Sequence, residues 1–145
     1  MIVKISTKGR YALRLMIDLA QNGQGKCVSL HDISTRQEIS TKYLEQIVSA
    51  LTKAGLIRSI RGAQGGYTLI KEPNQYTAGD ILRAVEGNLS CVACLETEDN
   101  LCSRKENCQT LDFYKGLNKV INDYVDGVTL QDFMEHHSEN GTYII

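Results

Sequence analysis

Four of the five cysteines lie within 18 residues: Cys91, Cys94, Cys102 and Cys108. Two, seven and five positions separate them, and we name residues 91–108 the cysteine loop. Thiolate is a soft ligand, and clustered thiolates hold zinc or iron–sulfur clusters. Zinc is the alternative to an iron–sulfur cluster, although five residues separate Cys102 from Cys108 and zinc knuckles typically have a spacer of about two to four residues. Metal-free thiol–disulfide sensing is a third possibility, because a pair spaced like Cys91 and Cys94 can be redox active.

Length and composition suit one compact domain of an ordinary globular protein. The chain has 145 residues, of which 42% are hydrophobic and 23% are charged. No apolar run approaches the roughly 20 residues of a membrane span, and the N-terminus has no apolar segment typical of a signal peptide. We therefore expect a cytoplasmic protein without a membrane partner. Reducing conditions there favour metal ligands or redox centres over a structural disulfide framework.

The net charge of −1 hides a strong asymmetry between the two halves of the chain. Residues 1–71 carry 11 Lys and Arg against 4 Asp and Glu, a net charge of +7, whereas residues 72–145 carry 5 against 13, a net charge of −8. Such an asymmetry is consistent with a first half that faces a polyanion. The simpler alternative is that these charges form an ordinary solvated surface. The pattern of predicted helices distinguishes the two interpretations.

Three helices are predicted in the basic half, over residues 7–22, 29–37 and 40–53. The second helix is short and the third, which Ser40 can cap, carries an apolar stripe, so the pair has the layout of a helix-turn-helix. Side chains able to contact phosphates or base edges occupy the outer face of the third helix: Thr41, Lys42, Glu45, Gln46, Ser49 and Lys53.

Two β-like runs follow this pair of helices, at residues 56–60 and 67–70. The glycines of residues 61–66 permit the positive φ angles of a tight turn between them. A helix-turn-helix followed by a β-hairpin is a winged helix, in which Arg58 and Arg61 would reach the DNA backbone or the minor groove. The first half is therefore predicted to bind double-stranded DNA.

The acidic half contains a capped helix from Thr77, the cysteine loop, a long amphipathic helix up to Gly127 and a last helix from Thr129. A long helix outside a small DNA-binding unit favours homodimerisation, which would pair two recognition helices on a near-palindromic operator. We expect a mostly α (α+β) fold with residues 1–72 as the winged helix and 73–145 as the loop and dimerisation helices. The chain contains no phosphate-binding loop, nucleophile motif or recognisable catalytic carboxylate pair, so an enzyme is not expected.

Three segments closely resemble one family: STKGRYALRLMIDLA, TKYLEQIVSALTKAGLIRSIRGAQGGYTL, and TAGDILRAVEG before the cysteine loop. The chain resembles the IscR-type winged-helix regulators, the Rrf-two family, whose members include IscR, NsrR and CymR. The resemblance covers nearly the whole chain and implies a homodimeric bacterial transcription factor. With the helix pattern, it predicts these DNA-contacting residues: Ser40, Thr41, Lys42, Tyr43, Glu45, Gln46, Ser49, Arg58, Arg61, Gly65 and Gly66.

The resemblance also implies three ligands for an iron–sulfur cluster, Cys94, Cys102 and Cys108, with the 2Fe–2S form favoured over 4Fe–4S. Leu111 stands where IscR-type members often have a ligating histidine, and residues 8–10 lack the acid that the nitric-oxide-sensing branch takes from the first helix of the partner subunit. Cys91, Asp112 or a residue of the other subunit remains for the fourth position. The alternatives are a cluster-free regulator controlled by a partner protein or thiol oxidation, as in the CymR branch, and a zinc-stabilised interaction module.

Overall fold

The computed structural model describes residues 4–139, with side chains up to residue 136. The first half forms α1 (Thr7–Asn22), α2 (Leu30–Gln37), α3 (Thr41–Lys53), β1 (Ile57–Ile60) and β2 (Gly66–Leu69). The second half forms the short 3-10 helix η1 (Pro73–Gln75), α4 (Ala78–Glu86), a second one, η2 (Ala93–Leu95), α5 (Leu111–Gly127) and α6 (Leu130–Glu139). This arrangement confirms the predicted mostly helical fold with a helix-turn-helix and a β-hairpin.

The helices of the first half begin where local capping dictates. The hydroxyls of Ser6, Ser29 and Ser40 each accept a hydrogen bond from the backbone N–H three residues later. Each bond satisfies a backbone donor that the first helical turn leaves without a partner. Because capping is a local interaction, the three predicted helices agree closely with the observed ones.

The hairpin pairs β1 with β2 in antiparallel register, with Arg58 opposite Thr68. The end of the hairpin next to its turn is joined to the loop before α2, because Val28 and Tyr67 exchange backbone hydrogen bonds of 2.9 and 2.8 Å. Gly66 lies so close to this loop that an added Cβ would overlap the carbonyl of Val28. The expectation that the hairpin glycines serve positive φ angles holds for Gly62, at +119°, whereas Gly66 is needed for close approach.

One hydrophobic core joins the two halves of the chain. Leu15 and Met16 of α1 are fully buried, and they share this core with Leu44 of α3 and Leu130 at the start of α6. Tyr76 is also fully buried, and its hydroxyl donates to the carbonyl of Leu56 at 2.7 Å and accepts from the backbone of the segment after β2. Residues on both sides of the hairpin are therefore anchored to one aromatic side chain.

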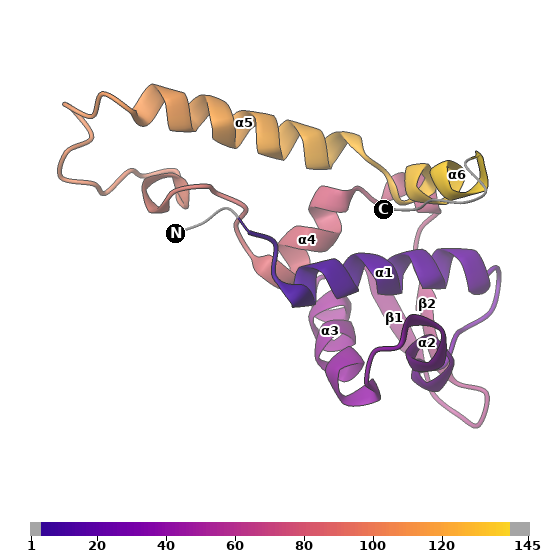
Figure 1. The fold of residues 1–145 in the computed structure, drawn as a ribbon. Helices are drawn as coiled ribbons and strands as arrows, with labels where there is room; N and C mark the ends of the chain where they lie inside the picture. Colours follow the sequence, from indigo (N-terminus) through magenta and orange to yellow (C-terminus); the bar gives the residue numbers. More distant parts are fainter. Residues whose placement is uncertain (1–3, 140–145) are drawn as a thin grey trace.

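α5 differs from the other long helices because none of its residues is buried. Figure 1 shows it running past the body of the molecule, with the cysteine loop connecting its outer end back to α4. Within residues 4–139 no helix is both long and apolar enough to span a bilayer.

Candidate nucleic-acid interface and cysteine loop

The apolar stripe of α3 packs into the core and turns the opposite face to solvent. Leu44, Ile47, Val48 and Leu51 are at most 3% exposed. The predicted contact residues of this helix are accordingly exposed: Thr41, Lys42, Glu45, Gln46 and Ser49. The structure thus brings these side chains together on one accessible helix face, as a recognition helix requires.

Tyr43 is an exception on this helix, because its ring is half-buried against α1. The rings of Tyr43 and Tyr11 meet edge to face, with centroids 5.6 Å apart, and the guanidinium of Arg14 lies 5.1 Å from the centre of the Tyr11 ring. Ser40 caps the same helix through its hydroxyl. Tyr43 and Ser40 therefore help to fix the start and the orientation of α3.

A buried ion pair holds α2 against α1. Asp18 is 1% exposed, and both of its carboxylate oxygens accept from Arg36, at 3.0 and 2.7 Å. Gln37 donates a third bond at 2.9 Å and also accepts from Arg14. Burial alone would raise the pKa of Asp18, but the hydrogen bonds from Arg36 and Gln37 outweigh it and hold the pKa below its ordinary value.

This network was not predicted from the sequence. The available signal was an acid at position 18, between the apolar positions 15, 16 and 19 of a predicted amphipathic helix. An acid on a buried helix face requires a partner. The partners lie in the last turn of α2, just before Glu38, whose φ of +56° and ψ of +44° place it in the left-handed region.

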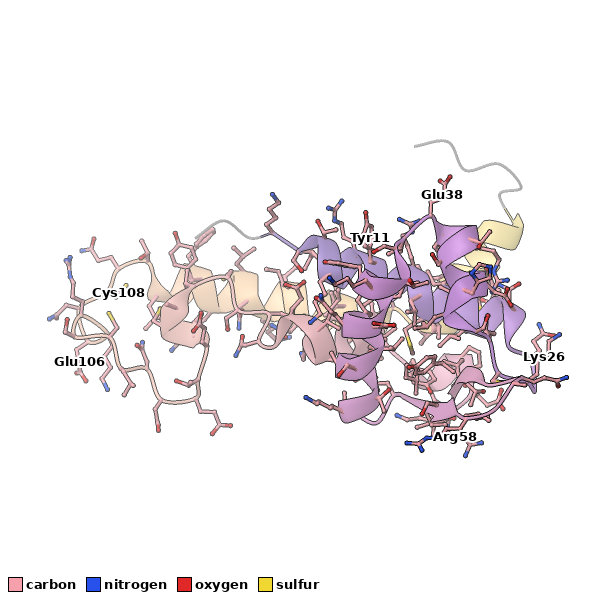
Figure 2. All side chains as sticks on the ribbon, turned by 90° about the horizontal axis from the view of Figure 1, so that it is seen from below. Tyr11, Lys26, Glu38, Arg58, Glu106 and Cys108 are labelled. Carbon is pink, nitrogen blue, oxygen red and sulfur yellow. The ribbon has the colours of Figure 1, made fainter. Side chains whose placement is uncertain are left out.

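Arg61 and Arg58 occupy different parts of the hairpin. Arg61 lies in the exposed turn, whereas Arg58 borders an open hollow of about 830 Å³ that is completed by the end of α1 and by α6. Gly65 is the last residue of this turn and Gly66 begins β2. The thiol of Cys27 donates to the carbonyl of Gln64 in the turn at 2.9 Å. Cys27 is half-buried. Figure 2 views this side of the molecule and shows Arg58 and Lys26 projecting from it.

The two ends of the cysteine loop differ in exposure. Residues 88–96 are held by internal bonds, including that of the Ser90 hydroxyl to the carbonyl of Leu95 at 2.6 Å. Every residue from 101 to 110 is exposed, and the side chain of Leu101 is 88% exposed. Figure 2 shows Cys108 and Glu106 at the outer end of the loop, far from Lys26 and Arg58.

The four thiols of the loop are not equivalent. Cys102 and Cys108 are exposed and Cys94 is half-buried, whereas Cys91 is buried against α5. The Cys91 thiol donates to the carbonyl of Tyr114 at 3.7 Å, and its backbone N–H donates to Asn118 at 3.3 Å. The start of the loop is therefore attached to α5 by Cys91.

The donor chemistry of the loop fits a thiolate-ligated metal group. A hydrogen bond from the hydroxyl of Thr110, followed by one from its backbone N–H, lowers the pKa of Cys108, and thiolate is the form that binds metal. Among the described residues, no three His, Cys, Asp or Glu side chains are grouped closely enough to hold a metal ion. Cys94, Cys102 and Cys108 are thus accessible to a cluster but are not gathered in this conformation.

Comparison with known proteins identifies closely similar chains. The profile of the Rrf2 family, described as iron-dependent transcriptional regulator, matches residues 5–136. The transcriptional regulator CymR of Bacillus subtilis is 43% identical over 135 residues, which cover 92% of this chain and 91% of the relative.

Two solved structures share the whole architecture. The structure of CymR, the global cysteine regulator of B. subtilis, superposes with a TM-score of 0.75 at 41% identity, covering 92% of this chain and 97% of CymR. IscR of T. potens superposes with a TM-score of 0.74 at 37% identity, covering 98% of this chain and 93% of IscR. The chain is therefore similar to CymR and IscR to nearly the same degree.

Proposed function

The chain belongs to the Rrf2 family of DNA-binding transcriptional regulators, and we propose that it acts as a cytoplasmic homodimer whose operator binding is controlled by an iron–sulfur cluster in the cysteine loop. Its relatives are transcriptional regulators and not enzymes. The observation that carries the proposal is the position of three accessible thiols between α4, which packs on the DNA-binding unit, and the projecting helix α5.

We assign homodimerisation to an apolar face of α5. Phe113, Val120 and Tyr124 are 65%, 65% and 72% exposed, and Leu117 lies between them on the same side. Residues three, four and seven apart lie on one helix face, so these side chains form a continuous apolar stripe. A second copy of the chain would cover it and bring two α3 helices onto the successive half-sites of an operator.

Sedimentation of two variants tests this assignment. Val120→Lys should convert the dimer to a monomer, because it places a charge in the proposed contact. Lys115→Glu is the matched control, since Lys115 is exposed on the opposite side of α5 and its variant should remain dimeric. A Val120→Lys protein that still sediments as a dimer would refute the assigned face.

We propose Cys94, Cys102 and Cys108 as cluster ligands, and 2Fe–2S as the favoured cluster. When bound, the cluster would cross-link three points of the loop through metal–thiolate bonds and make the loop sensitive to oxidants. Cys108 lies three residues before α5, so ordering the loop would bias the orientation of that helix. Cys91 remains the candidate for a fourth thiolate, and it would have to leave its contact with Tyr114 to serve.

Metal analysis with a visible spectrum after anaerobic purification tests the ligand assignment. Wild-type protein should be coloured and contain iron and sulfide, whereas Cys94→Ala, Cys102→Ala and Cys108→Ala should each lose most of both. Cys27→Ala is the control, because Cys27 lies beside the hairpin and should not affect iron content. Stoichiometric zinc would identify a zinc-stabilised module instead.

The second candidate is a cluster-free regulator controlled by a partner protein or by thiol oxidation. It is favoured by the similarity to CymR and by the separation of the thiols in the described conformation. This candidate predicts protein that remains colourless and free of iron after reconstitution with iron and sulfide. That result would contradict the cluster proposal and leave the winged-helix assignment intact.

A further inference from the structure

The direction of α5 relative to the rest of the molecule depends on the contacts of Cys91 with Tyr114 and Asn118 and on a second set of contacts near the C-terminal end of the helix. All residues of α5 are exposed or half-buried, and Figure 1 shows its outer end lying well beyond α4. Backbone bonds fix the chain just after α5, because Ala78 donates to the carbonyl of Val128 at 2.8 Å and Leu130 donates to the carbonyl of Tyr76 at 2.9 Å. These bonds fix the position of the C-terminal end of α5, which we call its base. The direction of the helix depends on contacts of its side chains.

One side chain of α4 holds two successive turns of α5 next to this base. The guanidinium of Arg83 donates to both carboxylate oxygens of Asp126, at 2.6 and 3.0 Å, and to the side-chain oxygen of Asn122 at 2.7 Å. A planar guanidinium restricts the orientation of a bidentate partner more than a lysine does. Arg83 is half-buried, which reduces the competition from water.

A buried glycine allows the two helices to approach at the same point. An added Cβ at Gly79 would overlap the carboxylate of Asp126 and crowd the guanidinium of Arg83. α4 in turn packs along α1, and the carboxylate of Glu86 accepts from the backbone N–H and hydroxyl of Ser6. α4 is therefore attached on one side to the DNA-binding unit and on the other to α5.

Because α5 is long, a small rotation at its base produces a large displacement at its other end. At 1.5 Å per residue, its first turn lies roughly 22 Å from Asp126, so a rotation of about 10° at the base moves that turn by about 4 Å. This displacement is close to the rise of one DNA base pair, about 3.4 Å. In a dimer formed through α5, the same rotation changes the separation of the two α3 helices.

We propose that Arg83 is a positioning residue that sets the direction of α5 and thereby the half-site spacing of the operator. The inference rests on the proposed homodimer through α5. Asp126 and Asn122 supply the complementary side of the contact.

Operator selection with Arg83→Gln tests the proposal. Wild-type protein first selects its half-site from a random duplex library. Wild type and variants are then titrated against duplexes that carry two such half-sites with the central spacer unchanged, shortened or lengthened by one or two base pairs. We expect wild type to favour one spacing by tenfold or more, and Arg83→Gln to reduce this preference to about threefold or less. Asp126→Asn should have the same effect, and the double variant should add nothing further.

Two further variants separate positioning from general destabilisation. Lys119→Gln removes an exposed ion pair within α5 and should keep the wild-type spacing preference. Arg83→Lys keeps the charge without the bidentate contact, so it should relax the preference even if Arg83→Gln folds poorly. An unchanged spacing preference in a folded, dimeric Arg83→Gln or Arg83→Lys protein would overturn the inference and leave the homodimer standing. Monomeric wild-type protein would overturn both.

Discussion

Replacing Asp18 with Asn removes the charge that holds α2 against α1. The carboxylate accepts three side-chain hydrogen bonds, two of them from the guanidinium of Arg36. Removing one partner of a buried ion pair typically costs about 3–5 kcal/mol, because the other charge is left uncompensated. The cost should be smaller here, because the side chain of Arg36 is 38% exposed and can be hydrated, and because Asn retains one acceptor oxygen. We therefore expect a loss of about 2–3 kcal/mol in the free energy of unfolding.

Urea and thermal unfolding of Asp18→Asn and wild type measure this loss. For a chain of this length, about 2–3 kcal/mol corresponds to a decrease in Tm of roughly 6–10 °C. Asp123→Asn is the matched control, because Asp123 forms an exposed ion pair with Lys119 and its loss should cost at most about 0.5 kcal/mol. An Asp18→Asn variant that loses less than about 1 kcal/mol would refute the reasoning.

The pH dependence of the same comparison supplies a second check. The pKa of Asp18 is lowered in the folded protein, so its contribution to stability is complete above the unfolded pKa of about 3.9 and is lost as pH falls through the folded pKa. The difference between wild type and Asp18→Asn should be constant from pH 7 to pH 5 and shrink at lower pH. A difference that grows on acidification would contradict the assigned sign.

Substitutions at three further positions address the winged-helix half of the chain. Glu38→Gly should raise the free energy of unfolding by about 0.5–1 kcal/mol, because glycine adopts the left-handed conformation of this position without strain. Glu38→Gln keeps a side chain there and should not raise the free energy of unfolding. Equal effects of the two substitutions in urea titrations would exclude strain as the cause. Glu45→Ala should relax base choice in operator selection by about 1–3 kcal/mol at one position, and an unchanged selected sequence would count against a base contact. Arg61→Ala should weaken binding to all duplexes and lower the salt slope by about 1, whereas a sequence-dependent loss would indicate base readout.

Local interactions made much of the fold predictable. The serine caps and apolar stripes of α1, α2 and α3 depend on residues within a few positions of one another, and their boundaries were accordingly predicted well. The second strand was predicted to begin one residue too late, at residue 67, because the glycine before it was expected to belong to the turn. In the structure Gly66 begins β2 and pairs with Ile60. Its place is determined by the approach of Val28, which the local sequence does not reveal.

The parts of the site that depend on distant contacts were not predictable in the same way. Asp18 and Arg36 are 18 positions apart, and Arg83 and Asp126 are 43 apart. In both cases the charges are visible in the sequence, but charged surface residues are common and the pairing becomes evident only from the packing of the helices. The burial of Cys91 against α5 is a third such case, and it distinguishes this thiol from the three accessible cysteines.

Paired binding titrations test most directly whether the state of the cysteine loop controls DNA affinity. Fluorescence anisotropy would give the Kd of the selected operator for reconstituted protein and for the same protein after chelator treatment, with Cys94→Ala taken through both steps. We expect iron- and sulfide-containing wild type to differ from its stripped form by about tenfold in Kd, and the two Cys94→Ala samples to agree. Identical Kd values for loaded and stripped wild type would contradict the account.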